Sequence, residues 1–323
     1  MIKWGIIGPG TIAHAFAKEV CNTQFGKLVS IYGRNEIKTN NFAKEYNIEK
    51  SYCDLDKFLN DEDIDAVYIA TPHSHHMEFA IKCINAKKHI LCEKPFSYNE
   101  KTSTEVLKLA KENNVFIMEA LWTLFLPAII KAKSWVDEGK IGKVKMITAN
   151  FGFKSEEDIN SRLYNPNLAG GALLDVGIYP ILLSNFIMND YPEIINSTAV
   201  MTSTNVDEST LISLKYKEGA LASLTCSIKA ETDNTAVIYG ENGKIVIPLF
   251  WMAKTATLYS NSETVTFEDE YQGTGYMYEI EEANKCILNN KLESNVSSHN
   301  LTLELAKIMD EIRNQIGLVY PFE

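Results

Sequence analysis

The first 120 residues alternate short apolar runs with segments that have a helical period. Apolar runs at Ile2–Ile7 and Lys27–Gly33 predict buried strands, and Thr11–Val20 between them places an apolar residue at every fourth position. This alternation is typical of β-α-β units, whose strands lie parallel in one sheet. Further strands are predicted at Ala66–Ala70, Lys88–Cys92 and Val115–Met118, and further helices at Glu78–Asn85 and Glu100–Asn113; Ser97-Tyr98-Asn99-Glu100 fits a capping box for the last of these.

The pattern changes after Trp122. From about Ser197 to Phe267 the chain shows strand-like alternation, and Asn242-Gly243 marks a hairpin turn. Two helices are predicted to close the chain. We therefore expect two domains, residues 1–122 and 123–323, the second with a sheet that buries one face. The residues predicted to be buried are Ala222, Leu224, Cys226 and Ile228 on a strand and Leu301, Leu305, Ile308, Ile312 and Ile316 on the last helix.

Composition and charge restrict the class of protein. With 46% hydrophobic and 23% charged residues, the 323-residue chain suits a soluble globular protein rather than a disordered one. A formal charge of -11 disfavours partners with phosphate backbones and anionic membrane surfaces. We therefore expect neither nucleic acid nor a membrane as a partner.

Cysteine usage and the N-terminus indicate a compartment. Six cysteines without a C-x-x-C pair predict free thiols in a reducing environment, and the N-terminal residues read as a strand and turn rather than a secretory signal. We therefore expect a cytoplasmic protein. Leu168–Ile187 is long and apolar, but Asp175, Pro180 and three glycines within it favour a buried helix over a membrane span.

A glycine-rich turn joins the first predicted strand to the first predicted helix. Gly8-Pro9-Gly10-Thr11-Ile12-Ala13 has the G-x-G-x-x-G/A spacing in the context that gives this motif its meaning. Gly8 permits the tight turn and Gly10 lets the backbone approach a pyrophosphate, which the N–H groups at the helix start, from Thr11 and Ile12, would bind. The alternative is a structural turn without a ligand.

The end of the second strand bears on the choice of dinucleotide. An NAD enzyme usually places an acidic residue there, about twenty residues beyond the glycine motif. This chain has Arg34, with Lys38 one turn later, and no acid. The two cations favour NADP, with NAD still possible; the alternative is two solvated side chains on a helix.

Two polar segments follow predicted strands and therefore lie at the carboxyl edge of the sheet. They are Ala70–His76, with three histidines, and Cys92–Pro95. Open α/β sheets bind ligands at this edge. No Cys, Asp or Glu with ligand spacing accompanies the histidines, so a metal site is not favoured.

Three side chains are candidates for chemistry. The ammonium of Lys94 could lower the pKa of a nearby phenol, although a surface lysine would look similar. Asp175 and Tyr179 lie four apart in an apolar helical segment and so share one face. If Lys94 is the partner of Asp175, the three form a charged cluster beside the nicotinamide. The alternative is a buried ion pair that joins two domains.

The motifs in this order resemble a known family. GPGTIA, TPHSHH, CEKP and GGALLDVGIYP are similar, over the whole chain, to the Gfo/Idh/MocA family of nicotinamide-dependent oxidoreductases. The segment Met118–Thr123 and the LDVGIY sequence most resemble the branch that contains dimeric dihydrodiol dehydrogenases and glucose–fructose oxidoreductase. Leu124 departs from relatives that often carry Arg there, which leaves the polar contacts of a substrate open.

The resemblance implies a fold and a set of site residues. It implies a Rossmann domain followed by an α/β domain with a large, mainly antiparallel sheet, whose open face commonly supports dimerisation. It also implies that Lys94 and Tyr179 flank the reacting carbon, with Tyr179 as general acid and base. The matching positions at the nicotinamide end are Thr71, Pro72, His76, Glu93 and Lys94, and those near the substrate cavity are Trp122 and Phe151.

The expected function follows from the motifs and the resemblance together. We expect hydride transfer between NADP(H) and a secondary alcohol, or its carbonyl, on a sugar, polyol or diol-like small molecule. Asp175 would position Lys94 or bind substrate hydroxyls. The alternatives are a non-catalytic regulator that binds a dinucleotide and a reductase of a non-sugar carbonyl; a homodimer is expected from the resemblance alone.

Overall fold

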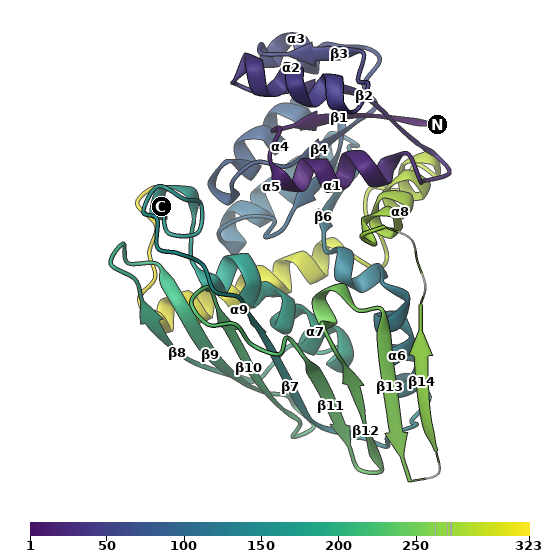
Figure 1. Ribbon diagram of the computed structural model, residues 1–323, viewed down its shortest axis with the longest axis vertical. Coiled ribbons are helices and arrows are strands. Elements are labelled where there is room, and N and C mark those ends of the chain that lie inside the picture. The colour runs from purple at the N-terminus through teal and green to yellow at the C-terminus, as the bar shows by residue number, and fades with distance from the viewer. Residues whose placement is uncertain (262, 270, 272) are drawn as a thin grey trace. The chain divides into compact units, whose positions relative to one another are not determined.

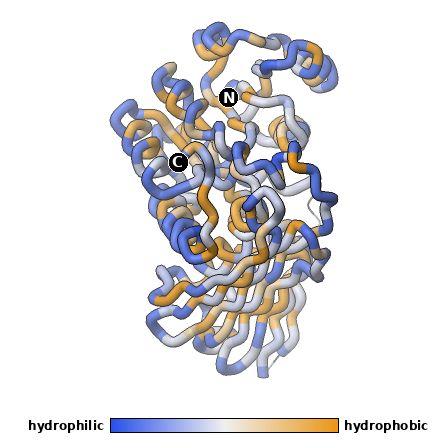
Figure 2. Tube along the Cα trace, turned by 90° about the vertical axis from the view of Figure 1, so that its left-hand side faces the viewer, coloured by the Kyte–Doolittle hydropathy of each residue, from blue (hydrophilic) through white to orange (hydrophobic). Residues whose placement is uncertain are grey.

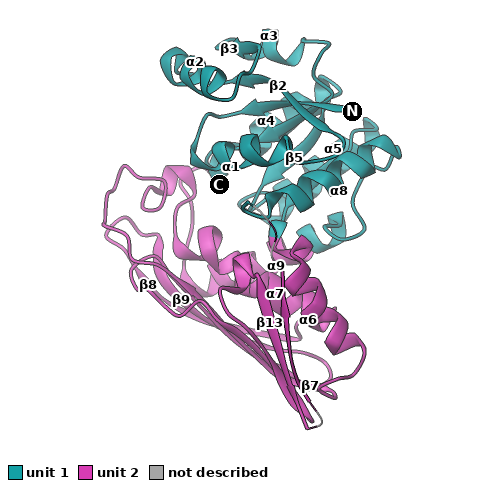
Figure 3. Ribbon diagram, turned by 45° about the vertical axis from the view of Figure 1, so that its right-hand side comes forward, with its two compact units in different colours: residues 1–122, 272–303 teal, residues 123–271, 304–323 magenta. Residues whose placement is uncertain are grey.

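A computed structural model describes residues 1–261, 263–269, 271 and 273–323. The chain forms two compact units (Figure 3), the first from 1–122 and 272–303 and the second from 123–271 and 304–323. The chain first passes from unit 1 to unit 2 after Trp122, where the pattern of apolar residues changes. Residues 272–303, in contrast, return to the unit that contains the N-terminus.

Unit 1 is built on a parallel sheet of six strands in the order β3-β2-β1-β4-β5-β6 (Figure 1). All its neighbouring strands pair in parallel, as predicted. The strand order reverses between β1 and β4, and ligands of open α/β sheets bind outside the carboxyl ends at such a reversal. The strands are β1 (Ile2–Ile7), β2 (Gly26–Tyr32), β3 (Lys50–Tyr52), β4 (Ala66–Ile69), β5 (His89–Glu93) and β6 (Ile117–Ala120); the helices are α1 (Thr11–Val20), α2 (Glu36–Glu45), α3 (Leu55–Leu59), α4 (His76–Asn85), α5 (Glu100–Glu112) and α8 (Tyr276–Leu288).

Buried polar contacts explain why α8 belongs to unit 1. The indole N–H of Trp4 in β1 donates to Asn284 Oδ1 of α8 at 2.8 Å, inside the core. Glu19 of α1 is 2% exposed and accepts from the backbone N–H and the hydroxyl of Thr274, at 2.6 and 2.9 Å. Because buried polar groups need partners, these contacts fix the late segment on the N-terminal core.

The capping box expected before α5 is wrong. Asn99, not Ser97, caps this helix, and its side chain accepts from Thr102 N–H at 2.9 Å. The Ser97 hydroxyl instead accepts from the N–H of Asn99, two residues on, at 3.5 Å. An Asn side chain at the residue before the helix is as good a cap as Ser, so the nearer residue takes the role.

Unit 2 is built on an eight-stranded sheet in the order β14-β13-β12-β11-β7-β10-β9-β8. Only β7 and β10 pair in parallel among these strands, so the predicted α/β fold with a mainly antiparallel second sheet is confirmed. The strands are β7 (Val144–Gly152), β8 (Ile194–Met201), β9 (Asp207–Lys215), β10 (Leu221–Ser227), β11 (Ala236–Gly240), β12 (Gly243–Ile247), β13 (Thr255–Ser260) and β14 (Thr264–Glu268); the long helices are α6 (Pro127–Asp137), α7 (Ile178–Met188) and α9 (His299–Ile316), of which α9 begins in unit 1.

One face of the second sheet is covered by helices. Helix α6 packs on β12, β13 and β14, and α7 packs on β7 and β10. The alternating apolar residues of β10 are buried as predicted, with Leu224 at 0% exposure. In the stripe of α9, Leu305, Ile308 and Ile312 are buried, whereas Leu301 and Ile316 at its two ends are only half-buried. Figure 2 shows apolar colour along the strands of this sheet and hydrophilic residues at the turns that join them.

The long apolar segment is part of this core. Pro166–Met188 has the length and hydropathy of a membrane span, but 89% of its apolar window is buried inside the protein. It contains a π-helical turn, Leu173–Gly177, directly before α7. Such turns are often found at functional sites.

Asp207, the first residue of β9, anchors the start of that π-helical turn. Its Oδ2 accepts from Leu173 N–H at 2.8 Å and from the Thr210 hydroxyl at 2.7 Å, and the side chain is fully buried. Burial raises the pKa of Asp207 to about 6. Gly171, at φ +116°, must be glycine, because a Cβ there would lie 2.2 Å from Asp207 Oδ1.

Candidate active site

The glycine turn between β1 and α1 has the geometry of a phosphate-binding site. Gly8 has φ +100°, and a Cβ there would lie 2.9 Å from the carbonyl oxygen of Ala70. Gly10 caps α1 with no side-chain hydrogen bond, and a Cβ there would meet nothing nearer than 3.7 Å. The protein's own packing therefore requires glycine at position 8, whereas position 10 keeps an open side where the first N–H groups of α1 face a ligand.

Arg34 and Lys38 lie beside this turn at the start of α2. Both side chains are exposed, and Asn35 caps the helix by accepting from Lys38 N–H at 3.0 Å. Gly33 brings the end of β2 against the turn, because a Cβ there would lie 2.7 Å from Pro9 Cδ. The two cations are thus available at the same edge of the sheet as the glycine turn.

His76 connects the segments that follow β4 and β5. Its Nδ1 lies 2.9 Å from the carbonyl oxygen of Pro95, and its Nε2 lies 2.9 Å from that of Thr71. The ring is fully buried, and this burial lowers the pKa of His76. His76 therefore contacts the backbone of both segments. Its place at the nicotinamide end, which the resemblance implies, stays a prediction.

Glu93 closes β5 next to Lys94. The phenol of Tyr68 donates to Glu93 Oε1, and the backbone N–H of Lys94 donates to Glu93 Oε2 at 3.2 Å. Burial, followed by the charge of Glu93, raises the pKa of Tyr68 well above its usual value, so Tyr68 remains a neutral donor. Glu93 is 6% exposed and Lys94 is half-buried, at the carboxyl end of the parallel sheet.

In unit 2, Tyr179 lies among aromatic rings. Its ring centroid is 5.4 Å from that of Phe151 in β7 and 6.2 Å from that of Trp251. Phe151 and Trp251 stack at 4.8 Å, and the Thr123 hydroxyl donates to the carbonyl of Trp251 at 2.8 Å. Tyr179 therefore contacts Phe151, which the resemblance places near the substrate cavity, and Trp251, which the sequence did not single out.

Asp175 has a partner that the sequence did not single out. Arg162 Nη1 donates to Asp175 Oδ1 at 2.7 Å. The Asp175 side chain is 7% exposed, whereas the Arg162 side chain is 55% exposed. A close backbone approach makes this pairing possible, because a Cβ on Gly170 would lie 2.9 Å from the carbonyl oxygen of Arg162. The Asp175 carboxylate is therefore held by a guanidinium within its own unit.

The candidate residues divide between the two units. Trp122 ends the first part of unit 1 and stacks on Tyr276 of α8, with centroids 4.4 Å apart. Unit 1 contains Gly8, Gly10, Thr11, Ile12, Arg34, Lys38, Thr71, Pro72, His76, Glu93, Lys94 and Trp122, and unit 2 contains Phe151, Asp175 and Tyr179. The proposed pairing of Lys94 with Tyr179 therefore joins residues of different units and stays a prediction.

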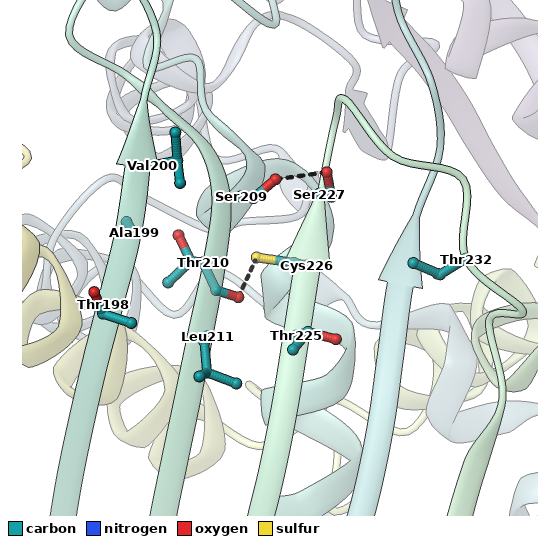
Figure 4. A pocket seen from close by; sticks show the side chains of 10 residues that line it. All are labelled: Thr198, Ala199, Val200, Ser209, Thr210, Leu211, Thr225, Cys226, Ser227 and Thr232. Atoms are coloured by element: carbon teal, nitrogen blue, oxygen red, sulfur yellow. Dashed lines mark hydrogen bonds between the residues drawn. The ribbon is translucent and has the colours of Figure 1, made fainter.

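A separate cavity of about 270 Å³ lies on the sheet of unit 2 (Figure 4). Strands β8, β9 and β10 supply most of its lining, which is rich in hydroxyl groups; Ser209 and Ser227 share a hydrogen bond of 2.7 Å there. The described residues that line it include none of the candidates for chemistry.

Comparison with known proteins identifies the family to which the chain belongs. Residues 2–121 match the oxidoreductase family with an NAD-binding Rossmann fold, and residues 129–246 match the GFO/IDH/MocA C-terminal domain. The chain is 35% identical to trans-1,2-dihydrobenzene-1,2-diol dehydrogenase of Danio rerio, over 99% of this chain and 98% of the relative. The chain belongs to the Gfo/Idh/MocA family of oxidoreductases.

Further Gfo/Idh/MocA relatives match over the same length. The chain is 32% identical to the scyllo-inositol 2-dehydrogenase (NADP(+)) IolU of Bacillus subtilis, over 99% of each protein. The crystal structure of KijD10, a 3-ketoreductase from Actinomadura kijaniata, superimposes with a TM-score of 0.88 at 21% identity over 98% of each chain. The expected NAD(P)-dependent oxidoreductase is thereby confirmed.

The residues of unit 1 fit the dinucleotide that this family uses. The start of α1 carries no side-chain cap, and Gly10 is open on one side. Among the described residues, neither the Thr71 Oγ1 nor the Ser74 Oγ has a hydrogen-bond partner, although both atoms are buried at the end of β4. Buried hydroxyls without partners are typical of a site that a polar ligand completes.

The sequence alone did not single out three residues that lie near the candidate site residues. Ser74 follows β4 within the segment that was already singled out. Arg162 precedes the double glycine, and only a folded backbone shows that it reaches Asp175. Trp251 lies about a hundred residues from Phe151 along the chain, so its aromatic character was the only signal.

The two glycines of the phosphate turn are expected to respond differently to alanine. Gly8→Ala forces a side chain onto left-handed backbone, so it should lower the free energy of unfolding by about 1–3 kcal/mol. Gly10→Ala fits its φ of -91° and should change that free energy by less than about 1 kcal/mol. It should nevertheless weaken NADPH binding at least about tenfold, because the new methyl group occupies the phosphate approach.

Urea unfolding and quenching of protein fluorescence by NADPH measure the two effects. The wild-type chain is the reference for both. Tight NADPH binding by Gly10→Ala, or equal stability losses in the two variants, would show that these glycines do not have the assigned roles.

Proposed function

We propose that this protein transfers hydride between NADP(H) and a secondary alcohol carbon of a sugar, polyol or diol-like substrate. The observation that carries the proposal is the Tyr179 phenol, 6% exposed, in an aromatic wall with Phe151 and Trp251. A phenol in that setting can exchange a proton with a substrate hydroxyl while the rings exclude water. Relatives named for a dihydrobenzenediol and for scyllo-inositol support the substrate class.

The chemistry of the wall also supports a ring-shaped, hydroxylated substrate. Phe151 and Trp251 offer flat apolar faces, on which the C–H face of a sugar or cyclic diol packs. The Arg162 and Asp175 pair adds a donor and an acceptor for the hydroxyl groups. Leu124, where related sequences often carry Arg, is 1% exposed and adds no polar contact of its own.

In the proposed mechanism, Tyr179 is the general acid and base. The bound nicotinamide supplies the hydride acceptor or donor. During oxidation Tyr179 takes the hydroxyl proton, and during reduction it returns the proton to the developing alkoxide. A free phenol has a pKa of about 10, so a fixed positive charge is needed for it to act near neutrality. We assign that charge to Lys94, which would also stabilise the alkoxide.

Removal of the Tyr179 hydroxyl tests the proposal. Tyr179→Phe should reduce kcat by roughly 10²–10⁴, because proton transfer loses its catalyst. The dissociation constant for NADPH should change by less than about twofold, since the phenol is not proposed to hold the dinucleotide. Absorbance of the reduced cofactor, followed across a panel of sugars, inositols, diols and ketones, measures turnover.

Tyr216 provides a matched control for that test. It is also fully buried in unit 2, and its hydroxyl shares a hydrogen bond of 2.7 Å with Ser184. Tyr216→Phe should lower stability but keep kcat. Unchanged turnover in Tyr179→Phe, or equal losses in both variants, would reject the assigned role.

Arg34 and Lys38 support NADP as the preferred cofactor. Both are exposed cations beside the glycine turn, in the place where an acid would bind the ribose of NAD. Glu78 of α4 lies near enough to Arg34 for the guanidinium to contribute to its lowered pKa, after the larger effect of its hydrogen bond to Lys82.

Titration with both reduced cofactors tests this preference. Arg34→Ala should weaken NADPH binding about tenfold or more, because a charge-assisted contact to the 2′-phosphate is lost, and change NADH binding less than about twofold. Lys44→Ala, which removes a cation from the last turn of α2, is the control and should affect neither. Tighter binding of NADH than of NADPH by the wild type would defeat the assignment.

We also propose a homodimer that forms through the open face of the second sheet. The face turned away from α6 and α7 carries Val200, Leu211, Leu221 and Met146, with 58%, 47%, 51% and 39% of their surfaces exposed. Leu221 lies opposite Met146 in the paired strands β10 and β7, so the apolar side chains adjoin. Exposed apolar side chains grouped on one sheet face favour association.

Sedimentation velocity tests the dimer. The wild-type protein should sediment at twice the chain mass, and a double Leu211→Lys, Leu221→Lys variant should sediment as a monomer, because two buried charges would oppose pairing. Ile37→Lys is the control, since Ile37 is 73% exposed on unit 1 and should leave the dimer intact. A monomeric wild type at micromolar concentration would refute this proposal.

A further inference from the structure

The backbone around Lys94 is held by buried side chains. The carbonyl of Pro95 meets His76 Nδ1 at 2.9 Å, and the N–H of Phe96 donates to Glu119 Oε1 at 2.7 Å. Phe96 and Glu119 are each 2% exposed, so the second contact lies wholly inside unit 1. The position of Lys94 therefore depends on contacts made by the next two residues of the chain.

Glu119 connects this segment to two other elements. It lies in β6 opposite Cys92 of β5. Its Oε2 accepts from the Thr302 hydroxyl of α9 at 2.8 Å, and its backbone carbonyl accepts from the Ser297 hydroxyl at 2.9 Å. Both carboxylate oxygens are thus engaged, one by the segment that carries Lys94 and one by α9.

The two hydrogen bonds of this carboxyl group are not equivalent. The Thr302 hydroxyl can donate or accept, so it adapts to a protonated, amide or ionised side chain. The Phe96 N–H can only donate and, at this depth, has no water to replace a lost acceptor. An oxygen at the Oε1 position of Glu119 is therefore required for Phe96, whereas the charge is not.

We propose that Glu119 is a positioning residue for Lys94, acting through its hydrogen bond to the Phe96 backbone. This inference deepens the proposed function, because it rests on the assignment of Lys94 as the cation beside the reacting carbon. Glu119 does not touch substrate or cofactor in this proposal. It determines where the backbone of the Lys94 segment lies, and hence where the ammonium is presented.

Three variants distinguish the effect of the acceptor oxygen of Glu119 from the effect of its charge and from that of its hydrogen bond to α9. Glu119→Gln keeps an oxygen for Phe96 and should retain kcat within about twofold, whereas the near-isosteric Glu119→Met lacks it and should lose at least about tenfold in kcat. Thr302→Val removes only the α9 contact and should retain kcat. The NADPH dissociation constant should stay within about twofold in all three, which distinguishes misplacement of Lys94 from collapse of the fold.

Competitive labelling with acetic anhydride tests the inference without turnover. The reactivity of Lys94 relative to Lys101, an exposed lysine of α5, is measured by mass spectrometry of digested protein. The ratio should change at least about threefold in Glu119→Met, because a displaced ammonium has a different environment, and stay within about 1.5-fold in Glu119→Gln and Thr302→Val. An unchanged ratio and unchanged kcat in Glu119→Met would overturn the inference.

A spectroscopic test follows from the titration of Glu119. Burial raises the pKa of Glu119 to about 7, against the hydrogen bonds from Thr302 and Phe96, which lower it; the nearby charge of Glu93 raises it and that of Lys94 lowers it. Ionisation strengthens the bond to Phe96, so the amide proton of Phe96 in ¹⁵N-Phe-labelled protein should move downfield as the pH rises through about 7.

The variants assign the origin of that shift. It should persist in Thr302→Val and vanish in Glu119→Gln, where the carboxyl group is absent. A shift of the same size in Glu119→Gln would show that Glu119 is not the acceptor and would overturn the inference. If the wild type turns over no member of the substrate panel, the proposed function fails by itself, and the labelling and amide experiments still decide the role of Glu119.

Discussion

The parallel order of the first sheet is the constraint on which the candidate chemistry depends. Because all its strands run in one direction, the segments that follow β1, β4 and β5 leave the sheet at the same edge. Gly8, Thr71 and Lys94 are far apart in sequence, yet each is the first or second residue after one of these strands. Gly8 lies so close to the carbonyl of Ala70 that the segments after β1 and β4 leave no room for a side chain between them.

Buried polar side chains then fix the backbone where the regular hydrogen-bond ladder ends. His76 holds the segments after β4 and β5, Glu119 holds Phe96, and in unit 2 Asp207 holds the start of the turn that leads to Tyr179. Each of these groups costs free energy to bury, and two of them are carboxyls with raised pKa values. A core built only for stability would use apolar residues there. Within each unit, these groups lie beside the segments that carry the proposed chemistry, where a fixed backbone position matters more than stability.

The sequence predicted the bounds of several helices and strands well, but it predicted contacts between distant residues poorly. The bounds of β1 and α1 were predicted to the residue, because a buried run and a helical period are properties of neighbouring residues. The start of α5 at Glu100 was predicted correctly, but its capping residue was not, since Ser97 and Asn99 are both acceptable caps and only folding decides between them. The partner of Asp175 and the return of 272–303 to the first unit depend on contacts between distant residues, which periodicity does not encode.

The aromatic wall around Tyr179 has a consequence for how the proposed reaction is controlled. The rings of Phe151 and Trp251 pack around the phenol, and a phenol needs a nearby cation to act as a base near neutral pH. Within unit 2, the guanidinium of Arg162 is already engaged by the Asp175 carboxylate, which offsets much of its charge. In the proposed mechanism, the cation that activates Tyr179 is assigned to Lys94 of unit 1. Without that cation a phenol stays protonated near neutral pH, so the proposed reaction depends on Lys94 as much as on Tyr179.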